Sequence, residues 1–115
     1  MKKDSIDEFL RIFEEAAIQH SRSTEVGDYK TANTCYNQIT KAVGNLDRTG
    51  SRIELREFLL HHISGVRIWS AAFLLQTELA NDAVAALEID AKQPGIHGLN
   101  AQETLSSWKN GNLNL

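Results

Sequence analysis

Val66-Arg67-Ile68-Trp69-Ser70-Ala71-Ala72-Phe73-Leu74-Leu75 is the stretch of this chain that decides the fold. Wound as a helix, it carries apolar side chains around nearly its whole circumference. Its two polar residues, Arg67 and Ser70, are three positions apart and share one narrow strip. A helix that is apolar all round is buried on several faces at once. We therefore expect a central helix, enclosed by other helices around Trp69.

The composition limits the class of protein. A length of 115 residues is ordinary for one domain, and the net charge of −3 disfavours a nucleic-acid-binding protein, which carries a basic face. The single cysteine, Cys35, offers no disulfide framework. The first residues lack the apolar core of a signal peptide, and no run approaches the ~20 apolar residues of a membrane span. We expect a cytoplasmic protein with one domain at residues 1–110 and a frayed tail at 111–115.

Helical periodicity predicts six helices and no sheet. Ser5 with Glu8 reads as a capping box, Asp28 as the cap of the second helix, and Pro94 as the end of the fifth. Short loops favour antiparallel neighbours, so the prediction is three stacked hairpins, as in a fragment of an α-solenoid. The expected ranges are 6–20, 28–45, 52–61, 66–76, 78 or 81 to 92, and 100–110.

The pattern specifies inner faces residue by residue. The inner positions of the fifth helix are expected to be Ala80, Ala83, Val84, Leu87 and Ala91. The inner stripe of the second helix is expected to hold Tyr29, Ala32, Cys35, Tyr36, Ile39, Ala42, Val43 and Leu46. The inner face of the third helix is expected to hold Leu55, Phe58, Leu59 and His62.

The central region resembles a HEAT-type repeat. Leu59-Leu60-His61, then Val66-Arg67, then Ala71-Ala72 with Leu74-Leu75 follow the order of that repeat. The resemblance implies a structural role for Arg67, whose guanidinium would hydrogen-bond backbone carbonyls or a neighbouring hairpin.

Over residues 6 to 110 the chain resembles the small bacterial family DUF2019. The resemblance rests on Ala32-Asn33 followed by Tyr36, on the leucine-rich segment ending in histidine, on the Val66-Arg67 helix and on Thr104-Leu105-Ser106-Ser107-Trp108. Members look like helical scaffolds that bind proteins, and some resemble the immunity proteins carried beside bacterial toxins. The resemblance implies a non-enzymatic protein without a cofactor.

Reactive side chains are few. Adjacent histidines such as His61 and His62 point about 100° apart on a helix and do not chelate as an i, i+4 pair does. Glu57 and His61 have that spacing, which fits a surface pair better than a metal site or hydrolase, because no further ligand follows at a recognisable spacing. Cys35 is interpreted as a small core residue, since a nucleophile needs a basic partner and access.

Charge is distributed unevenly along the chain. Residues 68–91 contain no Lys or Arg, so the loop and outer face of the fifth helix form an acidic patch that could steer a basic partner, although acids near a helix N-terminus also favour the helix dipole. Tryptophan is common in binding hot spots, although burial would also explain both indoles. The predicted partner-binding residues are Glu78, Asp82, Glu88, Asp90, Trp108, Glu14 and Glu15.

The leading hypothesis is a protein-binding domain, in its sharper form an immunity protein that blocks a basic toxin domain. The alternative is a helical repeat that binds nucleic acid through a basic face on the second and third helices. That face would be formed by Lys30, Lys41, Arg48, Arg52 and Arg56.

Overall fold

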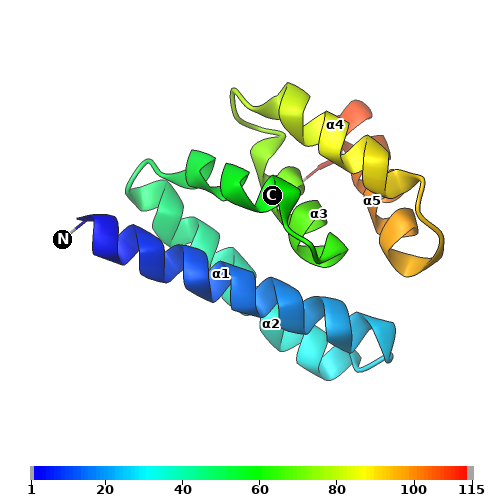
Figure 1. Ribbon diagram of the computed structural model, residues 1–115, viewed down its shortest axis with the longest axis horizontal. Coiled ribbons are helices and arrows are strands. Elements are labelled where there is room, and N and C mark those ends of the chain that lie inside the picture. Colours follow the sequence, from blue (N-terminus) through cyan, green and yellow to red (C-terminus); the bar gives the residue numbers. More distant parts are fainter. Residues whose placement is uncertain (1, 114–115) are drawn as a thin grey trace. The chain divides into compact units, whose positions relative to one another are not determined.

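The computed structural model describes residues 2–113, and the side chains from Ser5 onward. Within this range the chain is all-helical and has no strand, which confirms the predicted class (Figure 1). The elements are α1 (Lys2–Glu25), α2 (Tyr29–Arg48), the 3-10 helix η1 (Arg52–Leu60), α3 (Ser64–Leu74), α4 (Ala80–Ala91) and α5 (Gly95–Lys109). None of the helices in this range combines the length and the apolarity needed to cross a bilayer. Residues 114 and 115 of the expected tail lie outside the described residues.

Two compact units divide the chain, one ending at Glu54 and the other beginning at Leu55. The first contains α1 and α2, which pack side by side and antiparallel (Figure 1). Their connection is tight because Gly27 adopts a left-handed φ of 76° and Asp28 caps α2 by accepting a hydrogen bond from the Thr31 amide. The buried apolar side chains of this pair are Leu10, Phe13, Ala16, Ala17, Ala32, Cys35, Ile39, Ala42, Val43 and Leu46.

Three expectations about this pair are wrong. Tyr29 and Tyr36, predicted on the inner stripe, are 68% and 42% exposed. Ser5 is not a cap, because α1 already begins at Lys2 and Glu8 bonds Arg11 instead. The first helix also continues to Glu25 rather than ending near residue 20.

The third predicted helix forms as a 3-10 helix rather than an α-helix. Leu55 and Phe58 are both buried, and their spacing of three residues matches the period of about three residues per turn in a 3-10 helix. His62, expected on the same inner face, is exposed, and Leu60 is 93% exposed. His62 lies beyond the end of η1 at Leu60, so it no longer follows the face that Leu55 and Phe58 share.

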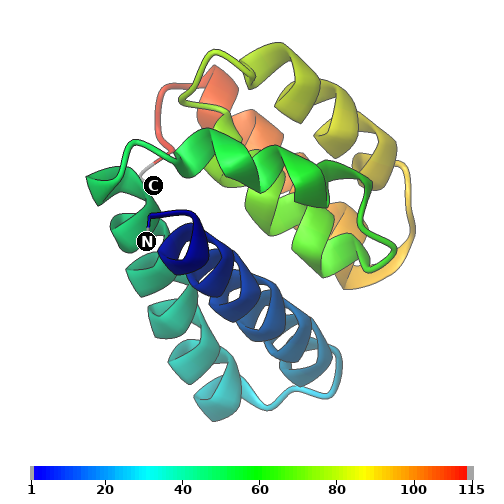
Figure 2. The same ribbon diagram turned by 60° about the vertical axis from the view of Figure 1, so that its left-hand side comes forward.

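The second unit is built around α3, which packs against both α4 and α5. α4 and α5 run antiparallel to each other on either side of a short turn (Figure 2). The buried side chains of α3 are Val66, Ile68, Ser70, Ala71, Ala72, Phe73 and Leu74. The prediction of a central buried helix is confirmed, but Trp69 is only half-buried at its edge, where its ring stacks on Phe73 at a centroid distance of 6.0 Å.

The packed helix pairs are α1 with α2, α3 with α4, α4 with α5, and α3 with α5. The first and last of the expected hairpins are therefore present. α5 begins at Gly95, earlier than the expected residue 100, because Pro94 occupies the position just before a helix as well as ending α4.

Candidate partner-binding surface

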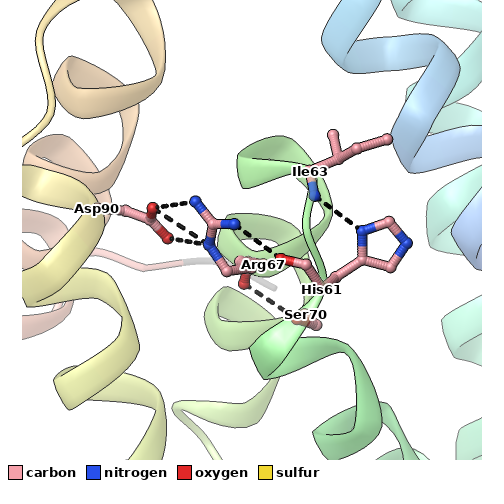
Figure 3. Close-up of polar contacts among 5 residues, drawn as sticks. All are labelled: His61, Ile63, Arg67, Ser70 and Asp90. Carbon is pink, nitrogen blue, oxygen red and sulfur yellow. Dashed lines mark hydrogen bonds and ion pairs between the residues drawn. The ribbon is translucent and has the colours of Figure 1, made fainter.

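The most connected polar group of the second unit is the ion pair between Arg67 on α3 and Asp90 on α4 (Figure 3). The Asp90 side chain is 2% exposed, and its Oδ1 lies 2.7 Å from Nη2 of Arg67. Arg67 also donates from Nη1 to the backbone carbonyl of His61 at 2.7 Å. Arg67 therefore joins the segment before α3 to α4, which is the structural role that the HEAT-type resemblance implied.

The position of Asp90 corrects one expectation. The sequence pattern predicts that it lies on the acidic outer face, but its carboxylate points inward and is held by Arg67. The sequence carried a signal for this, because Asp90 is three and seven positions after Leu87 and Ala83, which both face the core. Asp90 is therefore not available to a partner at the surface.

The two adjacent histidines, His61 and His62, make local contacts in the turn before α3. Nδ1 of His61 accepts a hydrogen bond from the backbone N–H of Ile63 at 3.0 Å, and the rings of His61 and His62 stack at 4.6 Å (Figure 3 shows the first contact). Nowhere in the described part of the chain do three or more His, Cys, Asp or Glu side chains gather as a metal ion would require.

In the first unit, burial, and to a lesser extent the charge of Asp28, raises the pKa of the Cys35 thiol.

The remaining predicted acids of the second unit are exposed. Glu78 precedes α4, and Asp82 and Glu88 lie on its solvent side. At about 100° per residue, Asp82 and Glu88 are roughly 120° apart around the helix, and Ala85 lies midway between them. Ile89 follows on the same row as Asp82 and is 64% exposed. We call these four residues, Asp82, Ala85, Glu88 and Ile89, the α4 face.

Further exposed apolar side chains follow directly after the turn. Ile96 and Leu99, three positions apart at the start of α5, are 38% and 62% exposed. The sequence pattern did not predict that these two residues, or Ile89, lie at the surface. The signal was present for Ile89, because it falls outside the stripe of Ala80, Ala83, Val84, Leu87 and Ala91 that was expected to face inward.

The other predicted partner-binding residues, Trp108, Glu14 and Glu15, do not lie on the α4 face. Trp108 is half-buried on α5. Glu14 and Glu15 belong to α1, and Glu15 already pairs with Arg11 at 2.9 Å. The hydrogen bond to Arg11 also lowers the pKa of Glu8. Acidic residues on α1 are thus partly neutralised by a cation of their own helix.

The basic face predicted for nucleic-acid binding is also partly neutralised by side chains of this chain. The Arg52 guanidinium donates from Nε and Nη2 to both carboxylate oxygens of Asp47, at 2.8 and 2.7 Å. Arg48 bonds the side chain of Asn45. Lys30, Lys41 and Arg56 remain exposed cations.

Comparison of the chain with protein-family models, with curated proteins and with solved structures finds no match.

Proposed function

We propose that this chain is a non-enzymatic, HEAT-like protein-binding domain that engages its partner through the α4 face, together with Ile96 and Leu99. The observation that carries the proposal is the pairing of exposed aliphatic side chains with acids on one helix: Ile89 is 64% exposed and stands beside Asp82 and Glu88. Apolar side chains left in water and rimmed by charges are typical of protein interfaces. The α1–α2 and α4–α5 hairpins are two of the three that a HEAT-like stack would require.

The partner proposed is a protein with a basic surface. From Ile68 to Ala91 the chain has no Lys or Arg, so a positive partner meets no repulsion along α4 before Lys92. Complementary charge accelerates encounter, and apolar contact then slows dissociation. A partner such as a toxin with a basic active-site region would be inhibited sterically, by an interface of about 800 Å² per protein.

The sharper version of the proposal is an immunity protein of the DUF2019 type that acts in the cytoplasm on a cognate toxin. It rests on the resemblance of Ala32-Asn33, Val66-Arg67 and the segment from Thr104 to Trp108. In this version the helical scaffold supplies no chemical group to a reaction. Its effect is to cover the site of another protein.

The experiment is affinity capture of the partner from the native host, followed by measurement of association rates with the purified partner. The charge-reversal variant Asp82→Lys/Glu88→Lys should associate at least about tenfold more slowly at low salt, and the difference should shrink as salt is added. The matched control is Asp7→Lys/Glu103→Lys, which changes the net charge equally at exposed positions on α1 and α5. Equal binding by both variants would rule out the α4 face.

A further inference from the structure

The solvent side of α2 has a composition opposite to that of α4. No Asp or Glu occurs between Asp28 and Asp47, so the outer surface of this helix carries no acidic side chain from Tyr29 to Leu46. Five exposed residues define what we call the α2 face: Tyr29, Lys30, Asn33, Tyr36 and Lys41. Neither lysine takes part in an ion pair within the part of the chain whose side chains are described.

The two tyrosines are the unusual members of this face. Tyr29 is 68% exposed and Tyr36 is 42% exposed. Tyrosine is a weaker helix former than the residues that usually fill exposed helix positions, so helix propensity does not account for it here. Tyrosine and asparagine are typical of recognition surfaces, because a rigid ring offers contact area at small entropic cost and an amide adapts its hydrogen bonds.

The two faces have matching layouts. On α2, Tyr29 and Tyr36 lie within about 20° of each other, Lys30 and Lys41 form a second row roughly 100–120° away, and Asn33 lies between the rows. The α4 face has one row with Ile89 and another with Glu88, separated by the same angle around the small residue Ala85. Small residues at the centre of such a face let two helices approach closely.

We infer that the α2 face of one copy of this chain docks on the α4 face of a second copy. The tyrosine rings would cover the row of Ile89 and Asp82, and the lysines would lie against Glu88. This inference rests on the proposed function, because it uses the α4 face as a protein-binding surface. It identifies a second copy of the chain as an occupant of that face when the basic partner is absent.

Nucleic acid is a less suitable occupant of the α2 face. The face holds two lysines on a chain whose net charge is −3, and Arg52 is already bound by Asp47. Affinity for nucleic acid grows with the number of phosphates neutralised, so two lysines give little binding at physiological salt. An acidic and apolar protein surface satisfies both the lysines and the tyrosines.

The expected association is weak and open-ended. α4 has 12 residues and is about 18 Å long, so a single helix-to-helix contact buries less than a standard interface. Because two different faces meet, a single contact leaves one α2 face and one α4 face for further copies. The average mass should therefore rise steadily with concentration at low salt and fall towards that of one chain at high salt.

The test is sedimentation velocity on purified protein from micromolar to millimolar concentration, at about 25 mM and about 500 mM NaCl. Lys30→Glu/Lys41→Glu alone and Asp82→Lys/Glu88→Lys alone should each remain monomeric at low salt. An equimolar mixture of the two variants should associate again, because the unaltered α4 face of the first variant meets the unaltered α2 face of the second, and the two altered faces also carry opposite charges. The control Arg56→Glu/Lys109→Glu, which alters exposed cations outside both faces, should associate like the native chain.

Three results would overturn the inference. They are a native chain that stays monomeric at millimolar concentration and low salt, a mixture of the two variants that does not associate, and a native chain that binds single-stranded (dT)20 through Lys30 and Lys41 without self-association. The measurement uses only this chain. Its failure therefore leaves the affinity-capture result, and the proposed function, to be judged separately.

Discussion

Arg67 of α3 and Asp90 of α4 are 23 positions apart in the sequence and face each other in an ion pair whose acidic member is almost wholly buried. The arginine side chain is 24% exposed, whereas that of Asp90 is 2% exposed. This asymmetry matters because a charge that loses its partner is costly only where water cannot replace that partner. The two residues should therefore respond differently to substitution.

Replacing Arg67 by Met should be the more damaging single change, because it leaves the Asp90 carboxylate buried without a cation. We expect a loss of about 3–5 kcal/mol in the free energy of unfolding, measured by urea denaturation. Asp90→Leu should cost less, since the Arg67 head group still reaches solvent. The double variant should be more stable than Arg67→Met alone, because no buried charge remains. If Arg67→Met cost less than the double variant, the pair would not be the main polar constraint of this unit.

Gly98 should not tolerate a side chain. A Cβ at this position would lie 1.8 Å from the backbone oxygen of Gln93, and that atom belongs to the turn between α4 and α5. The backbone would have to move, so we expect Gly98→Ala to lower the free energy of unfolding by about 1–3 kcal/mol.

The matched control for this substitution is Gly44, inside α2. A Cβ there meets nothing within 4 Å, so Gly44→Ala should raise stability by about 0.5–1 kcal/mol through better helix propensity. Thermal unfolding, monitored by circular dichroism, distinguishes the expected loss of stability in Gly98→Ala from the expected gain in Gly44→Ala. A stabilised Gly98→Ala variant would show that the turn can be rearranged at little cost.

Local signals in the sequence were sufficient for several elements. Asp28 specifies the start of α2 because its side chain satisfies a free amide of the first turn, which is a local property. The apolar run from Val66 identifies α3 because no other packing can bury so many faces. Both signals act within a few residues, so no knowledge of distant contacts was needed.

The remaining features depended on interactions that a pattern does not contain. Ser21 and Ser23 are polar yet buried, so α1 continues through a segment that looked like a loop. In η1 the spacing of Leu55 and Phe58 fits both kinds of helix, and only the tertiary environment selects the 3-10 form. Asp90 counted as a surface acid because its cation, Arg67, lies on another helix.

Cys35 should react slowly with thiol reagents in the folded protein. Burial, and then the negative charge of Asp28, raises its pKa above the ordinary 9.0, so the nucleophilic thiolate is scarce at neutral pH. We expect the reaction with DTNB at pH 7.5 to be on the order of tenfold or more slower than in the chain unfolded by urea. The Asp28→Asn variant keeps a capping side chain and removes the charge, so it should react somewhat faster than the native protein. A folded rate equal to the unfolded rate would contradict the buried position.

Asp28 should make the stability of the protein depend on pH in the acid range. Its carboxylate accepts hydrogen bonds from the Thr31 hydroxyl at 2.7 Å and the Thr31 amide at 3.2 Å, and these bonds lower its pKa from the ordinary 3.8. The Asp28 carboxyl group therefore loses its proton more readily in the folded state than in the unfolded state. The stabilisation is present above about pH 3.8 and is lost as the pH falls through the lower pKa of the folded state.

The measurement is the difference in melting temperature between the native protein and Asp28→Asn from pH 2.5 to pH 6. The native protein should be the more stable at pH 6, and its advantage should shrink as the pH falls below about 3.8, because the amide has no proton to bind. Asp7→Asn is the control, since Asp7 is an exposed acid of α1 that makes no hydrogen bond within the described side chains. Its difference from the native protein should stay small throughout. An advantage of the native protein over Asp28→Asn that is unchanged at pH 2.5 would show that the cap does not depend on the charge of the carboxylate.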